Sequence, residues 1–166
     1  MRDIIIPIFA FCLMSSVAAS QEKLDTRNHT LKNIRGCEVV IERLNEASAA
    51  IGLTEQQLKL DVEQRLRAAG IEIGRQYSPM LAVTVTGLLD RSRTGVVFGY
   101  SAYVDVEFWQ RVTIEANGFK DFAVTWKRGS IIGDQNNAAG KDQIRSAVRN
   151  LVDRFISAIL AANQQL

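Results

Sequence analysis

The chain has 166 residues, of which 47% are hydrophobic and 23% charged, so it is long enough for one domain with its own core and too short for two ordinary ones. Twenty basic and eighteen acidic residues leave a formal net charge of +2. Nucleic-acid binding requires basic residues concentrated on one face, and the short basic pairs here lie beside turns. The composition therefore predicts no nucleic-acid partner.

The first twenty residues have the layout of a secretory signal peptide. A short polar start precedes an apolar run from Ile4 to Met14, and small residues follow at positions 17–20. We predict cleavage after Ala19 or Ser20 and export, to the periplasm or as a secreted protein. A signal kept as an anchor is the alternative. The apolar run is shorter than the about 20 residues that span a bilayer, so we expect no transmembrane segment in the mature chain.

The two cysteines have different expected roles. A lipid-acceptor cysteine directly follows a small residue, whereas Phe11 precedes Cys12, so the sequence does not favour lipidation. Cleavage would leave Cys37 as the one remaining cysteine, which excludes an internal disulfide. Cys37 alternates with Val39 and Ile41 and is predicted to be buried in a strand.

We divide the chain into a signal peptide at 1–20, a flexible leader at 21–35 and a single α+β domain at 36–166. The domain begins with the strand that contains Cys37. After a small-residue connection, a capping box from Thr54 to Gln57 predicts the start of a helix, which ends near Gly70.

The middle of the domain has the pattern of hairpin-linked strands. Alternation around Leu81 indicates one strand, and the longest strand-like stretch runs from Val96 to Glu115. The Asn117-Gly118 pair is a strong hairpin signal, after which we expect a return strand from Phe119 to Lys127. A glycine- and asparagine-rich loop is expected from Gly129 to Gly140.

The last element is predicted to be an amphipathic helix that packs on the sheet. Its apolar stripe consists of Ile144, Val148, Leu151, Val152, Phe155, Ile156, Ile159 and Leu160. The order strand, helix, strands, helix predicts an α+β fold: a mainly antiparallel sheet of four to five strands with two helices on one face.

Two registers are open for the Asn117-Gly118 hairpin. A two-residue turn would place Trp109 opposite Trp126. A three-residue, bulged turn would instead gather apolar residues on the helix-covered face, and burial of apolar side chains outweighs an exposed ion pair. We therefore expect the bulged register, with Ile114 opposite Phe122, Trp126 buried and Trp109 exposed.

The sequence offers no catalytic, metal or cofactor motif. His29, the one histidine, lies in the polar leader, and no Cys, His or acidic cluster has metal-ligand spacing. The stretch from Gly133 to Asp142 lacks the spacing and hydroxyl of a phosphate-binding loop. Asp105 and Glu107 share a strand face, and a hydrolase using this carboxylate pair is the alternative to a non-enzymatic protein.

One strand face combines residue types that are common in binding hot spots. It carries Tyr103, Asp105, Glu107, Trp109 and Arg111. We predict that these five residues form a partner-binding surface. The alternative is that Trp109 lies over its own neighbours without a partner.

Three short stretches carry a resemblance to known proteins: residues 65–71 (RLRAAGI), 125–129 (TWKRG) and 151–156 (LVDRFI). They resemble a loose group of exported bacterial proteins of unknown function, over Glu38 to Asn163. The architecture is similar to periplasmic domains that assist envelope assembly and transport, including transport-auxiliary lipoproteins. The group has no established catalytic residues, so the resemblance transfers none to this chain. We predict a non-enzymatic exported binding or envelope-assembly module with a protein partner and no cofactor. A secreted inhibitor or effector is a further alternative.

Overall fold

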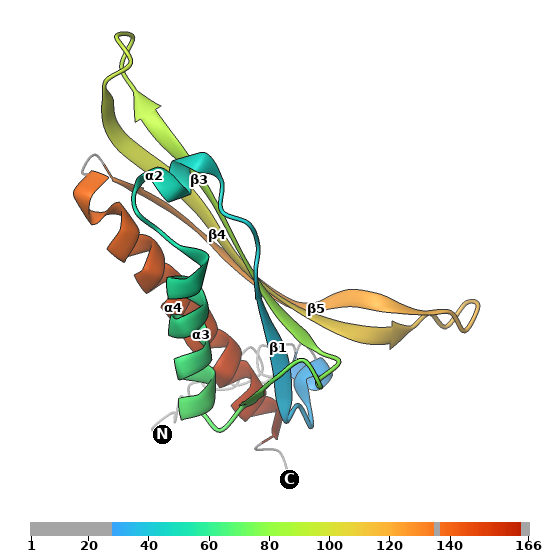
Figure 1. The fold of residues 1–166 in the computed structure, drawn as a ribbon. Coiled ribbons are helices and arrows are strands. Elements are labelled where there is room, and N and C mark those ends of the chain that lie inside the picture. Colours follow the sequence, from blue (N-terminus) through green and yellow to red (C-terminus); the bar gives the residue numbers. More distant parts are fainter. Residues whose placement is uncertain (1–27, 135–136, 164–166) are drawn as a thin grey trace, which may run out of the picture.

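The computed structural model describes residues 28–134 and 137–163 (Figure 1). The predicted signal peptide, its cleavage site at Ala19 or Ser20 and the first part of the predicted leader lie outside the described residues. In chain order the elements are the 3-10 helix η2 (His29–Leu31), β1 (Gly36–Ile41), α2 (Glu46–Ala50), α3 (Glu55–Ala68), β2 (Glu72–Ile73), β3 (Met80–Arg91), β4 (Val97–Thr113), β5 (Lys120–Asp134) and α4 (Asn137–Asn163).

The strands form a five-stranded sheet in the order β2-β1-β3-β4-β5, which confirms the α+β class. β3, β4 and β5 pair antiparallel, as expected. β1 runs parallel to both β2 and β3, so the sheet is mixed. The parallel pairs follow from the chain path, because α2 and α3 cross over between β1 and the strands beside it.

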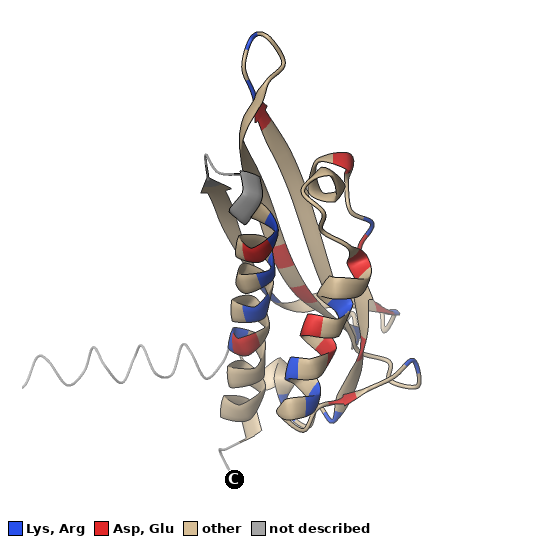
Figure 2. Ribbon diagram, turned by 60° about the vertical axis from the view of Figure 1, so that its left-hand side comes forward, with Lys and Arg blue, Asp and Glu red and all other residues tan. Residues whose placement is uncertain are grey.

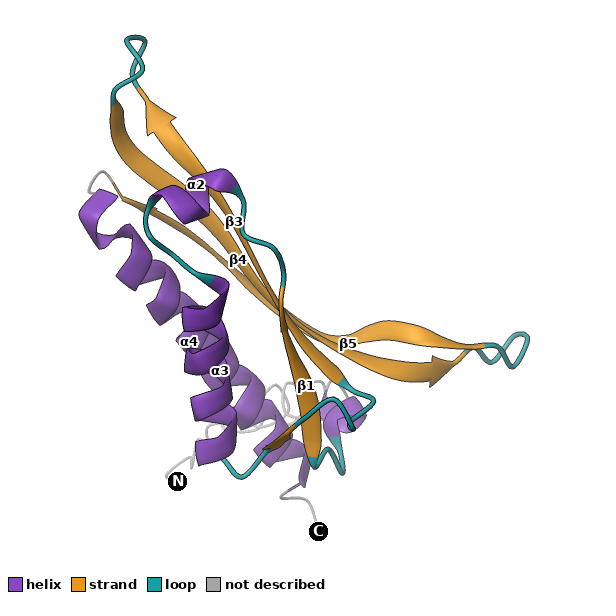
Figure 3. Ribbon diagram, in the orientation of Figure 1, coloured by secondary structure: helices purple, strands orange, loops and turns teal. Residues whose placement is uncertain are grey.

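The helices α3 and α4 pack side by side against one face of the sheet, and no described helix covers the other face (Figure 3). Two cross-helix ion pairs join them: Asp61 to Arg145, at 2.7 and 2.9 Å, and Arg65 to Asp153, at 2.6 and 2.7 Å. Figure 2 shows charged positions along both helices, and those that join α3 to α4 are Asp61, Arg65, Arg145 and Asp153. Both helices are therefore fixed to the sheet and to each other.

A third helix, α2, occupies the stretch expected to be a plain connection. Asn45 caps it, since its side-chain oxygen accepts from the Ser48 amide at 3.1 Å. The Asn45 amide also donates to the Gly87 carbonyl of β3 at 2.7 Å. The Asn45 side chain thus caps the start of α2 and also bonds this helix to β3 of the sheet.

The core lies between the sheet and the apolar stripe of α4, as predicted. Phe155 packs on Phe108 of β4 and on Trp126 of β5, with ring centroids 4.8 and 5.1 Å apart. The buried members of the stripe are Ile144, Val148, Leu151, Val152, Phe155 and Ile159, whereas Leu160 is exposed. None of the helices in residues 28–134 and 137–163 is both long and apolar enough to cross a membrane.

The capping box of α3 forms in part. The Thr54 hydroxyl accepts from the Gln57 amide at 3.2 Å, as predicted. The reciprocal bond is missing, since the side-chain oxygen of Gln57 is buried and has no hydrogen-bond partner among the described residues. Gly70 ends the helix with φ +77°, the left-handed conformation expected of it.

The packed structure begins before β1. Residues 28–35, which belong to the predicted leader, include η2, and Leu31 is fully buried in the core. Asn33 is bonded to the end of α4, since its backbone N–H donates to the side-chain oxygen of Asn163 at 2.9 Å. Hydrophobic contact and hydrogen bonding therefore fix this segment between β5 and α4.

The hairpin of β4 and β5 takes neither expected register. The turn closes between Ile114 and Phe119, so Thr113 pairs with Lys120 and Arg111 with Phe122. A bulge then places Thr125 as an extra residue in β5. The bulge restores the phase in which Trp126 faces the core opposite Phe108.

The bulge also determines how far the two tryptophan side chains are exposed. Trp126 is 7% exposed, which confirms its predicted burial. Trp109, which we expected to be exposed, is half-buried, and its indole N–H donates to Glu107 at 3.1 Å. β5 continues to Asp134, so most of the loop expected at Gly129–Gly140 is strand and helix instead. The two hairpins project from opposite ends of the sheet (Figure 1).

We expect Cys37 to react slowly with thiol reagents in the folded state. Its side chain is fully buried in β1, and burial raises the pKa of the thiol to about 12, so almost no thiolate forms near neutral pH. Modification by a chromogenic disulfide reagent should need denaturant. Complete modification of native protein within minutes would contradict the predicted burial.

Candidate functional site: the open face of the sheet

The face of the sheet turned away from the helices carries all five residues predicted to bind a partner. Inward-facing residues of β4, such as Val104 and Val106, are fully buried against α4. Because side chains alternate along a strand, the odd-numbered residues from Tyr103 to Arg111 point to the other side. We call this side, with its residues in β3 and β5, the open face.

Neighbouring strands add residues that the sequence did not single out. Cross-strand pairing sets Thr86, Thr84, Ala82 and Met80 of β3 beside the four predicted residues Tyr103, Asp105, Glu107 and Trp109. On the other side, Ile131, Gly129, Lys127 and Val124 of β5 lie opposite the same four. The open face is thus three strands wide in the region of the predicted site.

A three-residue ion cluster occupies the centre of the open face. The Lys127 ammonium lies 2.5 Å from the Asp105 carboxylate and 2.6 Å from that of Glu107. The hydrogen bond to Asp105 has the largest effect on the pKa of Lys127 and the bond to Glu107 the next largest. Both raise this pKa above its ordinary value. The lysine therefore stays charged and holds the two carboxylates together.

Asp105 is more enclosed than expected of a residue on a solvated face. It is 5% exposed, and its Oδ1 atom is buried without a hydrogen-bond partner among the described residues. Gly129 lies directly opposite, and a Cβ there would come within 2.7 Å of the Tyr103 hydroxyl. The missing side chain at Gly129 leaves room for the Tyr103 ring.

Apolar side chains flank the ion cluster on both sides. Towards the β3–β4 hairpin, Leu88, Tyr103 and Ile131 are exposed, with Ile131 at 82%. In the projecting arm of β4 and β5, Val124 and Phe122 are exposed, and Arg111 lies 5.7 Å over the Phe122 ring. The open face therefore combines a charged centre with apolar ends.

The arrangement of Asp105 and Glu107 does not favour hydrolysis. Glycoside hydrolysis requires two carboxyl groups on either side of a cleft that admits the substrate. Here both carboxylates lie on one strand and are bridged by Lys127. Within the described residues, no group of three or more His, Cys, Asp or Glu side chains could hold a metal ion.

We expect Lys127→Met to destabilise the domain and Asp105→Asn to restore part of the loss. Without the ammonium, two carboxylates remain side by side, one of them buried. Urea unfolding of the single and double variants measures the effect. Lys120→Met is a matched control, because Lys120 is exposed and has no ion pair among the described residues. A double variant less stable than Lys127→Met would contradict a charge effect.

The cluster could be anticipated only in part from the sequence. The alternation in β4 identifies Tyr103, Asp105 and Glu107 as sharing a face. Lys127 and Ile131 could not be assigned to it, because their positions depend on the register of β5 and its bulge. The continuation of β5 beyond Lys127 was not predicted, because Gly129 and Gly133 are more typical of a loop than of a strand.

No family model matches the chain. No curated protein matches it either. It is similar to several solved bacterial structures at low identity. A minor lipoprotein from Acinetobacter baumannii is 11% identical, with 77% of this chain and 92% of that chain covered and a TM-score of 0.40. A PelC dodecamer from Paraburkholderia phytofirmans is 17% identical, with 75% and 90% covered and a TM-score of 0.43.

The rare lipoprotein B from Shewanella oneidensis is also 17% identical, with 75% of this chain and 94% of that chain covered and a TM-score of 0.31. All three of these structures are less than 25% identical to the chain, and their TM-scores are below 0.5. At such identities and TM-scores they carry no argument about the function of this chain. The function must be inferred from its own residues.

Proposed function

We propose that this chain is an exported, non-enzymatic module that binds a partner protein of the cell envelope through the open face of its sheet. The observation that carries the proposal is the open face itself: no described helix covers it, and it presents exposed apolar side chains around an ion cluster. The signal-like N-terminal sequence supports export.

The composition of the open face supports protein binding. Tyrosine, tryptophan and arginine are enriched at the centres of interfaces, and here Tyr103, Trp109 and Arg111 lie on one strand. Exposed Leu88 and Ile131 lie on the strands to either side of Tyr103. A partner covering this region would bury apolar surface at one end and meet fixed charges at the centre, which favours a defined orientation.

Site-specific photo-crosslinking in the native cell tests the proposal. A benzophenone side chain at Tyr103 or at Ile131 should give the same adduct with one envelope protein. Leu60 of α3 is a matched control, because it is apolar and 45% exposed, close to the 41% of Tyr103, but belongs to the helical layer. The adduct should be absent from the Leu60 variant. Equal adducts from all three positions, or none from the open face, would contradict the proposed surface.

A further inference from the structure

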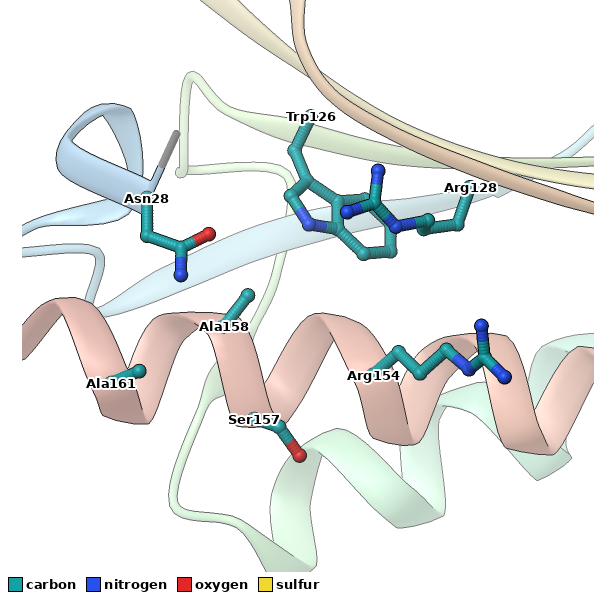
Figure 4. Close-up of a pocket in the computed structure, with 7 residues that line it drawn as sticks. All are labelled: Asn28, Trp126, Arg128, Arg154, Ser157, Ala158 and Ala161. Atoms are coloured by element: carbon teal, nitrogen blue, oxygen red, sulfur yellow. The ribbon is translucent and has the colours of Figure 1, made fainter. Parts of the chain in front are cut away.

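A groove of about 460 Å³ lies between β5 and α4, on the helix side of the sheet (Figure 4). The Trp126 indole points into it from β5, towards Ala158 of α4. Its remaining lining residues are Asn28, Arg128, Arg154, Ser157 and Ala161. The groove thus has an apolar floor formed by the indole and two alanines.

The groove is positively charged at its rim. Arg128 from β5 stacks over Trp126, with 5.7 Å between the guanidinium carbon and the ring centroid. Arg154 comes from α4 and is exposed. In the described part of the chain neither guanidinium has a carboxylate partner, and no acidic residue is among those that line the groove. Two arginines without counter-charges favour an anionic occupant.

The groove runs beside an unpaired strand edge. β5 pairs with β4 on one side, and at its bulge the Thr125 carbonyl accepts from Thr30 at 3.4 Å. From Trp126 to Asp134, no described strand pairs with the other edge. Residues 129–133 (GSIIG) contain neither a charge nor a proline, the common devices that protect an edge from further pairing. The backbone groups of this edge remain available to an extended chain.

We propose that an extended acidic segment of a partner protein occupies this groove and adds to the sheet beside β5. Backbone hydrogen bonds to β5 would hold the segment, as in other cases of strand addition. An acidic side chain would meet Arg128 and Arg154, and an apolar side chain two residues away on the same face would cover Trp126. This site lies on the helix side of the sheet and is independent of the open face.

Binding of two short peptides to the protein tests the proposal. One is a fluorescein-labelled peptide of alternating glutamate and valine, and the other has lysine in place of glutamate. Fluorescence anisotropy should detect binding of the glutamate peptide and not of the lysine peptide. The double variant Arg128→Glu/Arg154→Glu should bind the glutamate peptide at least about tenfold more weakly, because it loses charge-assisted hydrogen bonds. Arg93→Glu, an exposed charge reversal in the distant β3–β4 turn, should bind as the unmodified protein does.

Hydrogen exchange locates the bound peptide. Amides between Arg128 and Asp134 should exchange more slowly when the glutamate peptide is bound, whereas those of β2 at the opposite edge should not change. Equal binding of both peptides, no effect of the double reversal, or protection confined to the amides of β3 and β4 would overturn the proposal. So would a dimer in sedimentation experiments whose amides from Arg128 to Asp134 are already protected without peptide, because a second copy of this chain would then cover the β5 edge. Photo-crosslinking at Tyr103 is unaffected by any of these outcomes, so the two proposals fail separately.

Discussion

Val148→Asp should unfold the domain under conditions in which Asn150→Asp leaves it folded. Val148 is fully buried at the centre of the apolar stripe of α4, against the sheet. An aspartate there would be an unpaired charge in the core, at a cost of about 3–5 kcal/mol. Domains of this size are stable by only about 5–15 kcal/mol, so this substitution removes a large part of the total.

Two further variants separate the causes. Val148→Ala removes apolar volume without adding a charge and should cost about 2 kcal/mol. Asn150→Asp adds the same charge to an exposed position of α4 and should change stability by no more than about 0.5 kcal/mol. Urea unfolding followed by circular dichroism measures all three. Equal midpoints for Val148→Asp and Asn150→Asp would show that the stripe does not face the core.

The same helix shows which parts of the fold a sequence can reveal. The stripe of α4 and the alternation of β1 are local periodicities, so the burial of Val148 and Cys37 follows from spacing alone. The prediction that these two side chains are buried does not depend on which strands pair with each other. Gly70 was predictable for a similar reason, because a left-handed residue at the end of a helix is a local requirement.

The open face shows where local patterns fail. Asn117-Gly118 predicts a hairpin correctly but not its register, because the turn closes two residues wider than the tightest form allows. The bulge at Thr125 then shifts β5 by one residue, and this shift decides that Lys127 meets Asp105 and Glu107. A bulge is set by packing on both faces of the sheet, so the one-dimensional pattern did not contain it.

Long-range charge pairs were equally hidden. Asp61 and Arg145 are 84 positions apart, and no spacing rule connects a residue of one helix with a residue of another. The sequence shows only local pairs, such as Glu63 with Arg67 four residues later on α3. The pair that joins the helices is therefore a finding of the structure, and it leads to a second strong prediction.

Arg145→Met should destabilise the domain by about 1.5–3 kcal/mol. The Arg145 guanidinium donates to both oxygens of Asp61, whose side chain is only 11% exposed. Hydrogen bonds between charged groups contribute about this much, and their removal leaves an enclosed carboxylate with Arg149 at 3.9 Å as the nearest cation. Methionine keeps much of the apolar length of the side chain, so the loss reports mainly on the ion pair.

Arg67→Met is the matched control for this substitution. Arg67 also pairs with an acid at 2.8 Å, but its side chain is 57% exposed and its partner Glu63 lies on the same helix. Ion pairs between residues four apart on one helix contribute about 0.3–0.5 kcal/mol, and Glu63, itself 15% exposed, keeps Lys59 at 4.0 Å when Arg67 is replaced. Combining Arg145→Met with Asp61→Asn completes a double-mutant cycle, in which the double variant should be more stable than the sum of the single losses predicts.

The pH dependence of the Arg145→Met effect distinguishes an ion pair from simple packing. The hydrogen bond from Arg145, together with the nearby positive charges, lowers the pKa of Asp61 below its ordinary value of 3.8. A lowered pKa means that the pair stabilises the folded state fully at pH values above 3.8 and loses this effect as the pH falls through the folded-state pKa. The stability difference between the unmodified protein and Arg145→Met should therefore be constant from pH 7 to about 5 and shrink in more acidic solution. A difference that stays the same down to pH 2 would show that Arg145 acts through its apolar stem and not through Asp61.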